Sequence, residues 1–260
     1  MAHPVDRARS TRPWTAVGPA DAPGIVFIHG TRLTRAQWTT QIARLGARYR
    51  CVAIDLPGHG ERSAEPFTLA AASDAVVAAI DAEIPARRAV LVGLSLGGYV
   101  AIETADRSPD HVAGLVLAGC SAEPIGPVAA VFRVFAWGLE HAPAAVLDRV
   151  NRGYFRLRYG RSLAAPIIAG GFWPAGGAQA VRALLRARYL ERLARLWTPV
   201  LVVNGALDPV FGPGGDPWAA ACRRGRHVVL ARAMHLTSLD RPRAFSNLVA
   251  AFADDPAGTA

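Results

Sequence analysis

The sequence predicts an α/β fold, with a mainly parallel central sheet, helices on both faces of that sheet and an inserted helical cap. Apolar runs of strand length alternate with amphipathic segments of helix length through most of the 260 residues. This alternation favours parallel strands joined by helices. Residues 121–198 break it, because they contain several helical segments and no clear strand. Hydrophobic residues make up 52% of the chain and charged residues 19%, so a large core is expected and intrinsic disorder is not.

The expected elements follow one another along the chain in the order that this fold requires. Six apolar runs bounded by turn residues predict strands at Ile25–His29, Tyr49–Ile54, Arg88–Gly93, Val112–Ala118, Pro199–Val203 and His227–Ala231. Core helices are expected at Ala36–Arg48, Leu69–Ile84, Leu96–Asp106 and Arg241–Phe252. Residues 12–17 look strand-like, and residues 254–260 look like a frayed tail. The predicted organisation is a core in two parts, 1–120 and 199–260, with the cap 121–198 inserted between them.

The strongest local signal is the segment Gly93-Leu94-Ser95-Leu96-Gly97-Gly98, which follows a short apolar strand and opens a helix. A sharp strand-to-helix turn holds a serine in a strained backbone conformation and exposes its hydroxyl above the sheet. The Leu96 N–H would lie at the helix N-terminus, where free amides favour an anion. This context indicates that Ser95 is a nucleophile and not an ordinary N-cap serine.

A serine nucleophile needs a base that is oriented by an acid. Asp208 follows the strand Pro199–Val203, and His235 follows the strand His227–Ala231. Both therefore lie at the carboxyl ends of strands, where open α/β sheets place their sites. Asp216 is a competing acid, but it lies further along a Gly/Pro-rich loop.

The loop after the first long strand, His29-Gly30-Thr31-Arg32, is expected to supply a second backbone donor. The N–H groups of Thr31 and Leu96 would then converge on a developing alkoxide. Removing one such donor typically costs about 2.7–4 kcal/mol of transition-state stabilisation. His29 is interpreted as a structural residue that holds the shape of the loop, because one base suffices.

With these residues in place, the chain resembles the α/β-hydrolase superfamily, in particular its capped, esterase-like serine hydrolases. The resemblance covers nearly the whole chain and rests on five motifs in order. They are His29-Gly30 followed by Trp38, Asp55-Leu56-Pro57-Gly58-His59-Gly60, Gly93 to Gly98, Gly205-Ala206-Leu207-Asp208-Pro209, and Met234-His235 with Asp240-Arg241-Pro242 behind it. The resemblance implies Ser95 as nucleophile, Asp208 as acid, His235 as base, and Thr31 and Leu96 as oxyanion donors.

The chain departs from the pattern of this superfamily at two places, and its serine excludes one group of relatives. The family usually begins with two antiparallel strands, whereas one strand-like segment precedes Ile25 here. Met234 stands where the family commonly has a glycine before the histidine. Relatives that attack with an aspartate, the haloalkane dehalogenases and epoxide hydrolases, need a carboxylate where this chain has Ser95.

The predicted cap is rich in aromatic and basic side chains. It holds ten of the 20 aromatic residues of the chain, which suggests an apolar substrate pocket, although a small helical layer also needs large side chains to dock. Eleven arginines and four acidic residues give the cap +7 of the net charge of +9. A positive cap favours a substrate with an anionic group. The candidate substrate-binding residues are Arg32, Phe132, Phe135, Trp137, Tyr154 and Trp173. For Arg32, a purely structural contact to the loop or cap is the alternative.

The sequence therefore predicts a serine hydrolase that cleaves a carboxylic ester or a lactone through an acyl-enzyme, without a metal or cofactor. The substrate is expected to be a largely apolar small molecule that can carry an anionic group. The same triad serves C–C bond hydrolases and cofactor-free perhydrolases or lyases, and a slow-turnover ligand-binding receptor is the alternative of another class. Nucleic-acid binding is not expected, since phosphate binding needs no triad. The oligomeric state stays open.

The cysteines and the lengths of the apolar stretches indicate where in the cell the protein is expected. The three cysteines, Cys51, Cys120 and Cys222, are far apart and lack metal-ligand spacing, so neither a disulfide framework nor a zinc site is expected. Residues 1–10 lack the apolar segment of a secretory signal, and no stretch reaches 18 consecutive apolar residues. A cytoplasmic protein without a membrane span is expected.

Overall fold

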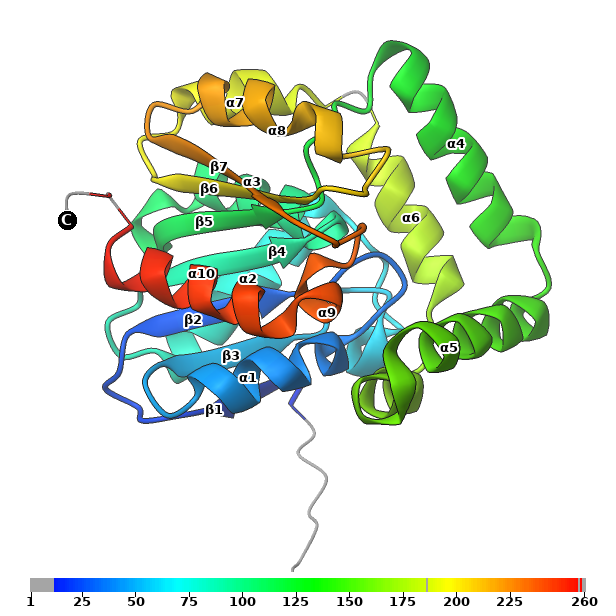
Figure 1. Cartoon of the computed structure of the whole chain (residues 1–260), viewed down its shortest axis with the longest axis horizontal. Coiled ribbons are helices and arrows are strands. Elements are labelled where there is room, and N and C mark those ends of the chain that lie inside the picture. The colour runs from blue at the N-terminus through cyan, green and yellow to red at the C-terminus, as the bar shows by residue number, and fades with distance from the viewer. Residues whose placement is uncertain (1–11, 186, 257, 259–260) are drawn as a thin grey trace, which may run out of the picture.

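A seven-stranded sheet lies at the centre of the computed structural model, which describes residues 12–185, 187–256 and 258 (Figure 1). The strand order is β1-β3-β2-β4-β5-β6-β7. Strand β1 pairs antiparallel with β3, and the other neighbours pair parallel. The strands are β1 (Trp14–Val17), β2 (Gly24–Ile28), β3 (Arg50–Ile54), β4 (Ala89–Leu94), β5 (Val112–Ala118), β6 (Val200–Gly205) and β7 (Gly225–Leu230). The predicted fold class is confirmed.

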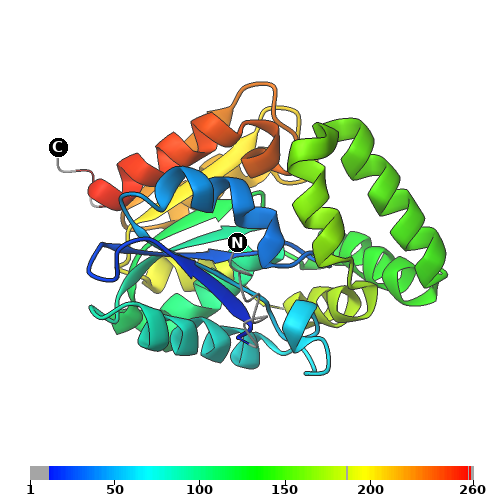
Figure 2. The same ribbon diagram turned by 90° about the horizontal axis from the view of Figure 1, so that it is seen from below.

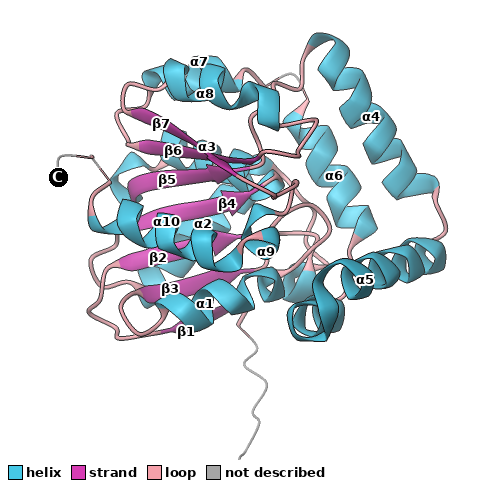
Figure 3. Cartoon of the chain, in the orientation of Figure 1, coloured by secondary structure: helices cyan, strands magenta, loops and turns pink. Residues whose placement is uncertain are grey.

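Helices cover both faces of the sheet, as predicted (Figures 2 and 3). The helices next to the sheet are α1 (Thr39–Leu45), α2 (Leu69–Glu83), α3 (Leu96–Arg107), α7 (Tyr189–Arg195), α8 (Gly215–Ala221), α9 (Thr237–Asp240) and α10 (Pro242–Asp254). The short 3-10 turns are η1 (Arg35–Trp38), η2 (Gly60–Arg62), η3 (Pro109–His111) and η4 (Gly212–Gly214).

Successive residues of a central strand enter opposite layers of the core. In β2, Ile25 and Phe27 join the cluster under α1 and α10, whereas Val26 and Ile28 join the cluster under α2, α3 and α8. Side chains alternate in this way because the period of a strand is two residues. Both faces of β2 are therefore buried, which explains why its sequence is apolar without alternation.

Several predicted boundaries shift for identifiable reasons. The helix expected at 36–48 is split into η1 and α1. Helix α8 begins inside the Gly/Pro-rich segment that was predicted to be a loop. Pro217 lies in the first turn of that helix, where proline is tolerated, and Trp218 is buried in the core. The predictions for residues 1–10 and for 257, 259 and 260 of the tail lie outside the described residues.

Among its described residues, the segment between β5 and β6 contains helices joined by loops and no strand; the helices are α4 (Gly126–His141), α5 (Ala144–Gly170), α6 (Pro174–Leu184) and α7. Helices α4 and α6 pack together at the carboxyl ends of the strands, and α5 packs against η1 and α9 (Figure 1). Helix α7 instead packs against α3 and α8, beside the sheet. We therefore propose that the cap consists of α4 to α6 and is shorter than the predicted 121–198.

Two further expectations can be compared with the described part of the chain. Cys51, Cys120 and Cys222 are buried and unpaired, as small hydrophobic residues would be. Among the described residues, no helix has both the length and the apolar content that crossing a membrane requires.

The close packing of α3 on the sheet yields a stability prediction. A Cβ added at Gly97 would overlap the backbone carbonyl of Ile28, whereas one added at Gly138 in α4 would meet nothing. Gly97→Ala should lower the free energy of unfolding by about 1–3 kcal/mol or more through overpacking. The matched control Gly138→Ala should raise it by about 0.5–1 kcal/mol, because alanine favours a helix over glycine. Urea denaturation measures both, and equal effects would contradict the packing described here.

Candidate active site

Ser95 lies at the sharp turn between β4 and α3. Its backbone has φ 54° and ψ −119°, a left-handed conformation that is rare and strained for a residue with a side chain. The turn is tight because α3 passes close to the end of β2, where Gly97 leaves room for the carbonyls of Ile28 and His29. Ser95 lines a cavity at this edge of the sheet.

Asp208 and His235 form a hydrogen-bonded pair beyond the ends of β6 and β7. The His235 Nδ1 lies 3.0 Å from the Asp208 Oδ2. The Asp208 Oδ1 accepts hydrogen bonds from the backbone N–H groups of Val210 (3.0 Å) and Phe211 (3.1 Å). Burial raises the pKa of the Asp208 carboxyl, but the hydrogen bond from His235 and the two amides outweigh it, so the pKa lies below its ordinary value. Asp208 is therefore an anion that holds the imidazole.

The imidazole of His235 is also held by its packing. The Phe211 ring stacks on it with 4.8 Å between centroids and 25° between planes. On another side lies Gly119, whose φ is +54° and where an added Cβ would lie 3.0 Å from Nδ1. The ring orientation is thus set by a hydrogen bond, an aromatic face and a glycine that leaves space.

Asp216, the competing acid, is not part of this pair. Its side chain is 90% exposed and contacts His227, with 2.7 Å between Oδ1 and Nδ1. That contact lies between α8 and β7 and away from the cavity that Ser95 lines.

The cavity has a volume of about 430 Å³ and lies under α4, α5 and α6. It is lined by Gly30, Thr31, Arg32, Leu33, Leu94, Ser95, Leu96, Tyr99, Val131, Phe132, Phe135, Tyr154, Phe155, Val181, Leu184, Asp208, Pro209, Val210, Phe211, His235 and Leu236. The structure thus brings together the predicted Ser95, Asp208 and His235 with Thr31 and Leu96. In the described chain, the backbone N–H groups of Thr31 and Leu96 donate to no protein acceptor.

Two buried histidines hold the loop that carries Thr31. The Nε2 of His29 accepts the N–H of Leu56 (3.1 Å), and the Nε2 of His59 accepts the N–H of Arg32 (3.2 Å). Each Nδ1 lies 2.9 Å from a backbone carbonyl. Burial lowers the pKa of His29 to about 4 and that of His59 to about 3, so both rings are neutral at pH 7. His29 contacts backbone groups of the loop, which is the structural role expected of it.

Three of the five cap aromatics predicted to bind substrate line the cavity. Phe132 and Phe135 lie three residues apart on α4 and share a face, and Tyr154 faces the same space from α5. The prediction for Trp137 is corrected. It lies five residues after Phe132, on another face of the helix, where it is 59% exposed and stacks on His141.

The prediction for Trp173 is corrected as well. Its indole donates to the carbonyl of Gly170 (3.2 Å), and it lines a separate shallow pocket beside Gly58 and Pro66. It reaches the site through its backbone only, since its N–H donates to the carbonyl of Arg32 (2.9 Å).

Other cavity residues were not predicted. Those on the cap helices are aliphatic or aromatic residues on helix faces, namely Val131, Phe155, Val181 and Leu184. Their helical spacing was the available signal, but spacing does not tell which helix faces the cavity.

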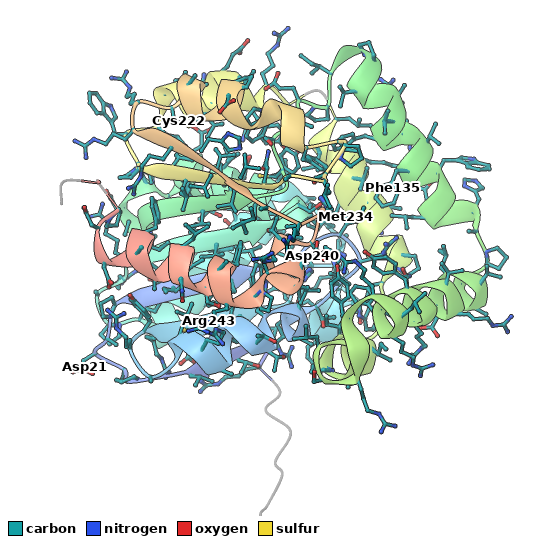
Figure 4. The ribbon with its side chains drawn as sticks, viewed as in Figure 1. Asp21, Phe135, Cys222, Met234, Asp240 and Arg243 are labelled. Atoms are coloured by element: carbon teal, nitrogen blue, oxygen red, sulfur yellow. The ribbon has the colours of Figure 1, made fainter. Side chains whose placement is uncertain are left out.

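A contact between the cap and the core lies next to His235. The Asp240 side chain is fully buried, and its Oδ1 lies 2.6 Å from the Arg158 Nη2 of α5. The other oxygen, Oδ2, accepts the backbone N–H of Met234 at 2.7 Å. Figure 4 shows Met234 and Asp240 side by side. One carboxylate therefore joins the cap to the residue that precedes the histidine.

Comparison with known proteins identifies the relatives of the chain. The alpha/beta hydrolase family matches residues 25–248. A pimeloyl-[acyl-carrier protein] methyl ester esterase of Neisseria meningitidis serogroup A is 31% identical over 263 residues, covering 90% of this chain and 79% of the relative. A 3-oxoadipate enol-lactonase 1 of Acinetobacter baylyi is 28% identical over 240 residues, covering 90% of both.

Solved structures agree on the fold. A hydrolase from Pseudomonas aeruginosa PA01 has a TM-score of 0.78 and 29% identity, with 92% of each chain covered. An esterase from Thermogutta terrifontis has a TM-score of 0.79 and 24% identity, covering 94% of this chain and 93% of that one.

The neutral histidines predict a pH dependence of stability. Both folded pKa values lie below the ordinary value of 6.5, so the unfolded chain binds protons first as the pH falls. The stability that they contribute is present above about pH 6.5 and is lost below it, by up to about 1.4 kcal/mol per pH unit for each histidine. Urea denaturation from pH 7 to pH 5 should show this slope. His59→Gln should reduce it and the exposed control His141→Gln should not; an unchanged slope in His59→Gln would refute the assignment.

Proposed function

This chain belongs to the alpha/beta hydrolase family, and from that premise we propose that it hydrolyses a carboxylic ester or lactone through a covalent acyl intermediate on Ser95. Esterases and enol-lactonases among its relatives support ester or lactone hydrolysis at the level of the family. The observation that carries the proposal is the strained turn that exposes Ser95 in the same cavity as the Asp208–His235 pair. A strained, exposed serine beside an oriented imidazole is the arrangement that nucleophilic catalysis needs.

The first half-reaction forms the acyl-enzyme. The Nδ1 of His235 is engaged by Asp208, which leaves Nε2 to take the proton from the Ser95 hydroxyl. The Ser95 Oγ attacks the carbonyl carbon, and the N–H groups of Thr31 and Leu96 stabilise the resulting oxyanion. The bond to the leaving alkoxide then breaks as His235 returns the proton to it. Asp208, which stays ionised, stabilises the imidazolium throughout.

The second half-reaction releases the acid. His235 takes a proton from water, and the hydroxide oxygen attacks the acyl carbon to give a second oxyanion at the same two amides. The bond to the Ser95 Oγ breaks, and His235 gives its proton to that oxygen. The net reaction adds one water to one ester bond and restores the free enzyme.

The cavity also indicates the kind of substrate. Its volume of about 430 Å³ lies toward the lower end of the range for sites that hold small molecules. The cap contributes Val131, Phe132, Phe155, Val181 and Leu184 to its walls, which favours a small substrate with an apolar body.

The nucleophile can be tested by covalent labelling. A fluorophosphonate probe should modify the protein once, and peptide mapping should place the adduct on Ser95. Ser95→Ala should abolish the labelling and leave the melting temperature near that of the wild type, because the hydroxyl faces the cavity and not the core. Labelling that survives this substitution would rule out Ser95 as the nucleophile.

Substitutions at Asp208 and Asp216 test which aspartate is the acid that orients His235. Asp208→Asn should lower kcat on a chromogenic short-chain ester by a factor on the order of 10⁴, since the amide no longer holds the imidazole in the productive tautomer. Asp216→Asn, on an exposed side chain outside the cavity, should leave kcat nearly unchanged. The reverse ranking would contradict the assignment, and a wild-type protein that binds the ester without turnover would favour a receptor.

A further inference from the structure

Arg32 has a backbone that does not suit an arginine. Its φ is +60°, in the left-handed region that glycine or asparagine adopts with less strain. Both of its backbone groups are nevertheless engaged, the N–H with the Nε2 of His59 (3.2 Å) and the carbonyl with the N–H of Trp173 (2.9 Å). The local backbone therefore gives no reason for an arginine here, and the reason has to lie in its side chain.

The guanidinium of Arg32 is largely buried without a counter-ion. Three other half-buried arginines pair with carboxylates, Arg35 with Asp55, Arg50 with Glu83 and Arg192 with Glu103. In the described chain no carboxylate lies within ion-pair distance of Arg32. Burial lowers the pKa of this guanidinium and the neighbouring Tyr154 opposes that effect, but arginine stays charged at pH 7 in either case. Buried charges in proteins are normally paired with an opposite charge. The Arg32 guanidinium departs from this rule, because it has no carboxylate partner among the described residues.

What surrounds Arg32 is aromatic and open to the cavity. Its Cζ lies 5.9 Å from the centroid of the Phe135 ring, a cation–π contact that stabilises the charge but does not neutralise it. Arg32 lines the cavity together with Tyr154 and Ser95. A bound anion would therefore lie between an arginine of the core loop and two aromatic residues of the cap.

We propose that Arg32 binds a carboxylate of the substrate, so that this enzyme acts on esters or lactones that carry a free carboxylate on an apolar body. The inference rests on the proposed function and specifies its substrate class. Arg32 follows Thr31 directly, so the carboxylate lies in the same cavity as the reacting carbonyl and takes no part in bond making. A planar guanidinium offers parallel N–H groups that match the two oxygens of a carboxylate.

The positive charge of the cap is a weaker explanation for such a preference. Several cap arginines are already paired, as Arg152 is with Asp148, Arg158 with Asp240 and Arg182 with Glu140. A long-range field would also be screened, since the Debye length falls from about 10 Å at 0.1 M to about 3 Å at 1 M salt. Direct contact with Arg32 inside the cavity is screened much less.

The test uses two irreversible probes that need no knowledge of the natural substrate. Both are methyl p-nitrophenyl alkylphosphonates of equal length, one ending in a carboxylate and the other in an isopropyl group. The Ser95 Oγ attacks phosphorus and displaces p-nitrophenolate, whose release gives the rate constant for inactivation. Wild-type protein should react about tenfold faster or more with the carboxylate probe, the scale of one hydrogen bond to a charged group, and most of this ratio should remain at 1 M salt.

Three variants test whether Arg32 causes the difference in inactivation rate between the two probes. Arg32→Gln should bring it close to one, and Arg32→Lys should retain part of it. The matched control Arg156→Gln removes the same charge from an exposed position on α5 and should leave the ratio unchanged. A wild-type ratio near one, a ratio lost at high salt, or a ratio that Arg32→Gln preserves would each overturn the inference. If neither probe reacts with the wild type, the proposed function itself fails and the inference falls with it.

Discussion

The close passage of α3 over the end of β2 is the constraint on which the site depends. Gly97 has no side chain, so the first turn of α3 lies directly against the carbonyls of Ile28 and His29. The chain leaves β4 and enters this helix through the left-handed conformation at Ser95. The same approach brings the Leu96 amide next to the loop that carries Thr31. The strain at one residue is thus sustained by the packing of a whole helix on the sheet.

Around this turn, the fold accommodates the protonation states of two histidines, one aspartate and one arginine in three different ways. His29 and His59 are neutral, and their Nε2 atoms accept the backbone N–H groups of Leu56 and Arg32. Asp208 is charged, and it has three hydrogen-bond donors that compensate for its burial. Arg32 has no ionic partner in the described chain, so the fold does not compensate its charge with a carboxylate. In our proposal, the positive charge of Arg32 is neutralised when the carboxylate of a substrate binds in the cavity.

The positions of the candidate catalytic residues could be predicted from the sequence, because the pattern that marks them is local. Ser95, Asp208 and His235 could be located because each follows an apolar strand, and parallel strands end at one edge of the sheet. Orientation within the cap could not be predicted, because it depends on which face of each helix meets the core. Phe135 lines the cavity and Trp137 does not, although they are two residues apart on one helix. Helix α8 was missed because glycine and proline at its start resemble a loop, and the buried Trp218 that anchors it is a tertiary effect.

The carboxylate of Asp240 has a consequence for how the cavity can open. It holds Arg158 of α5 with one oxygen and the amide of Met234, next to His235, with the other. Moving α5 away would strip a fully buried anion of its cation, so this part of the cap is tethered to the catalytic loop. Helix α4 packs mainly against α6, to which the Glu140–Arg182 ion pair also joins it, and much of its apolar surface is exposed. The cap is therefore joined through α5 to the loop that carries His235, and a change at the Arg158–Asp240 ion pair would reach the residue next to the histidine.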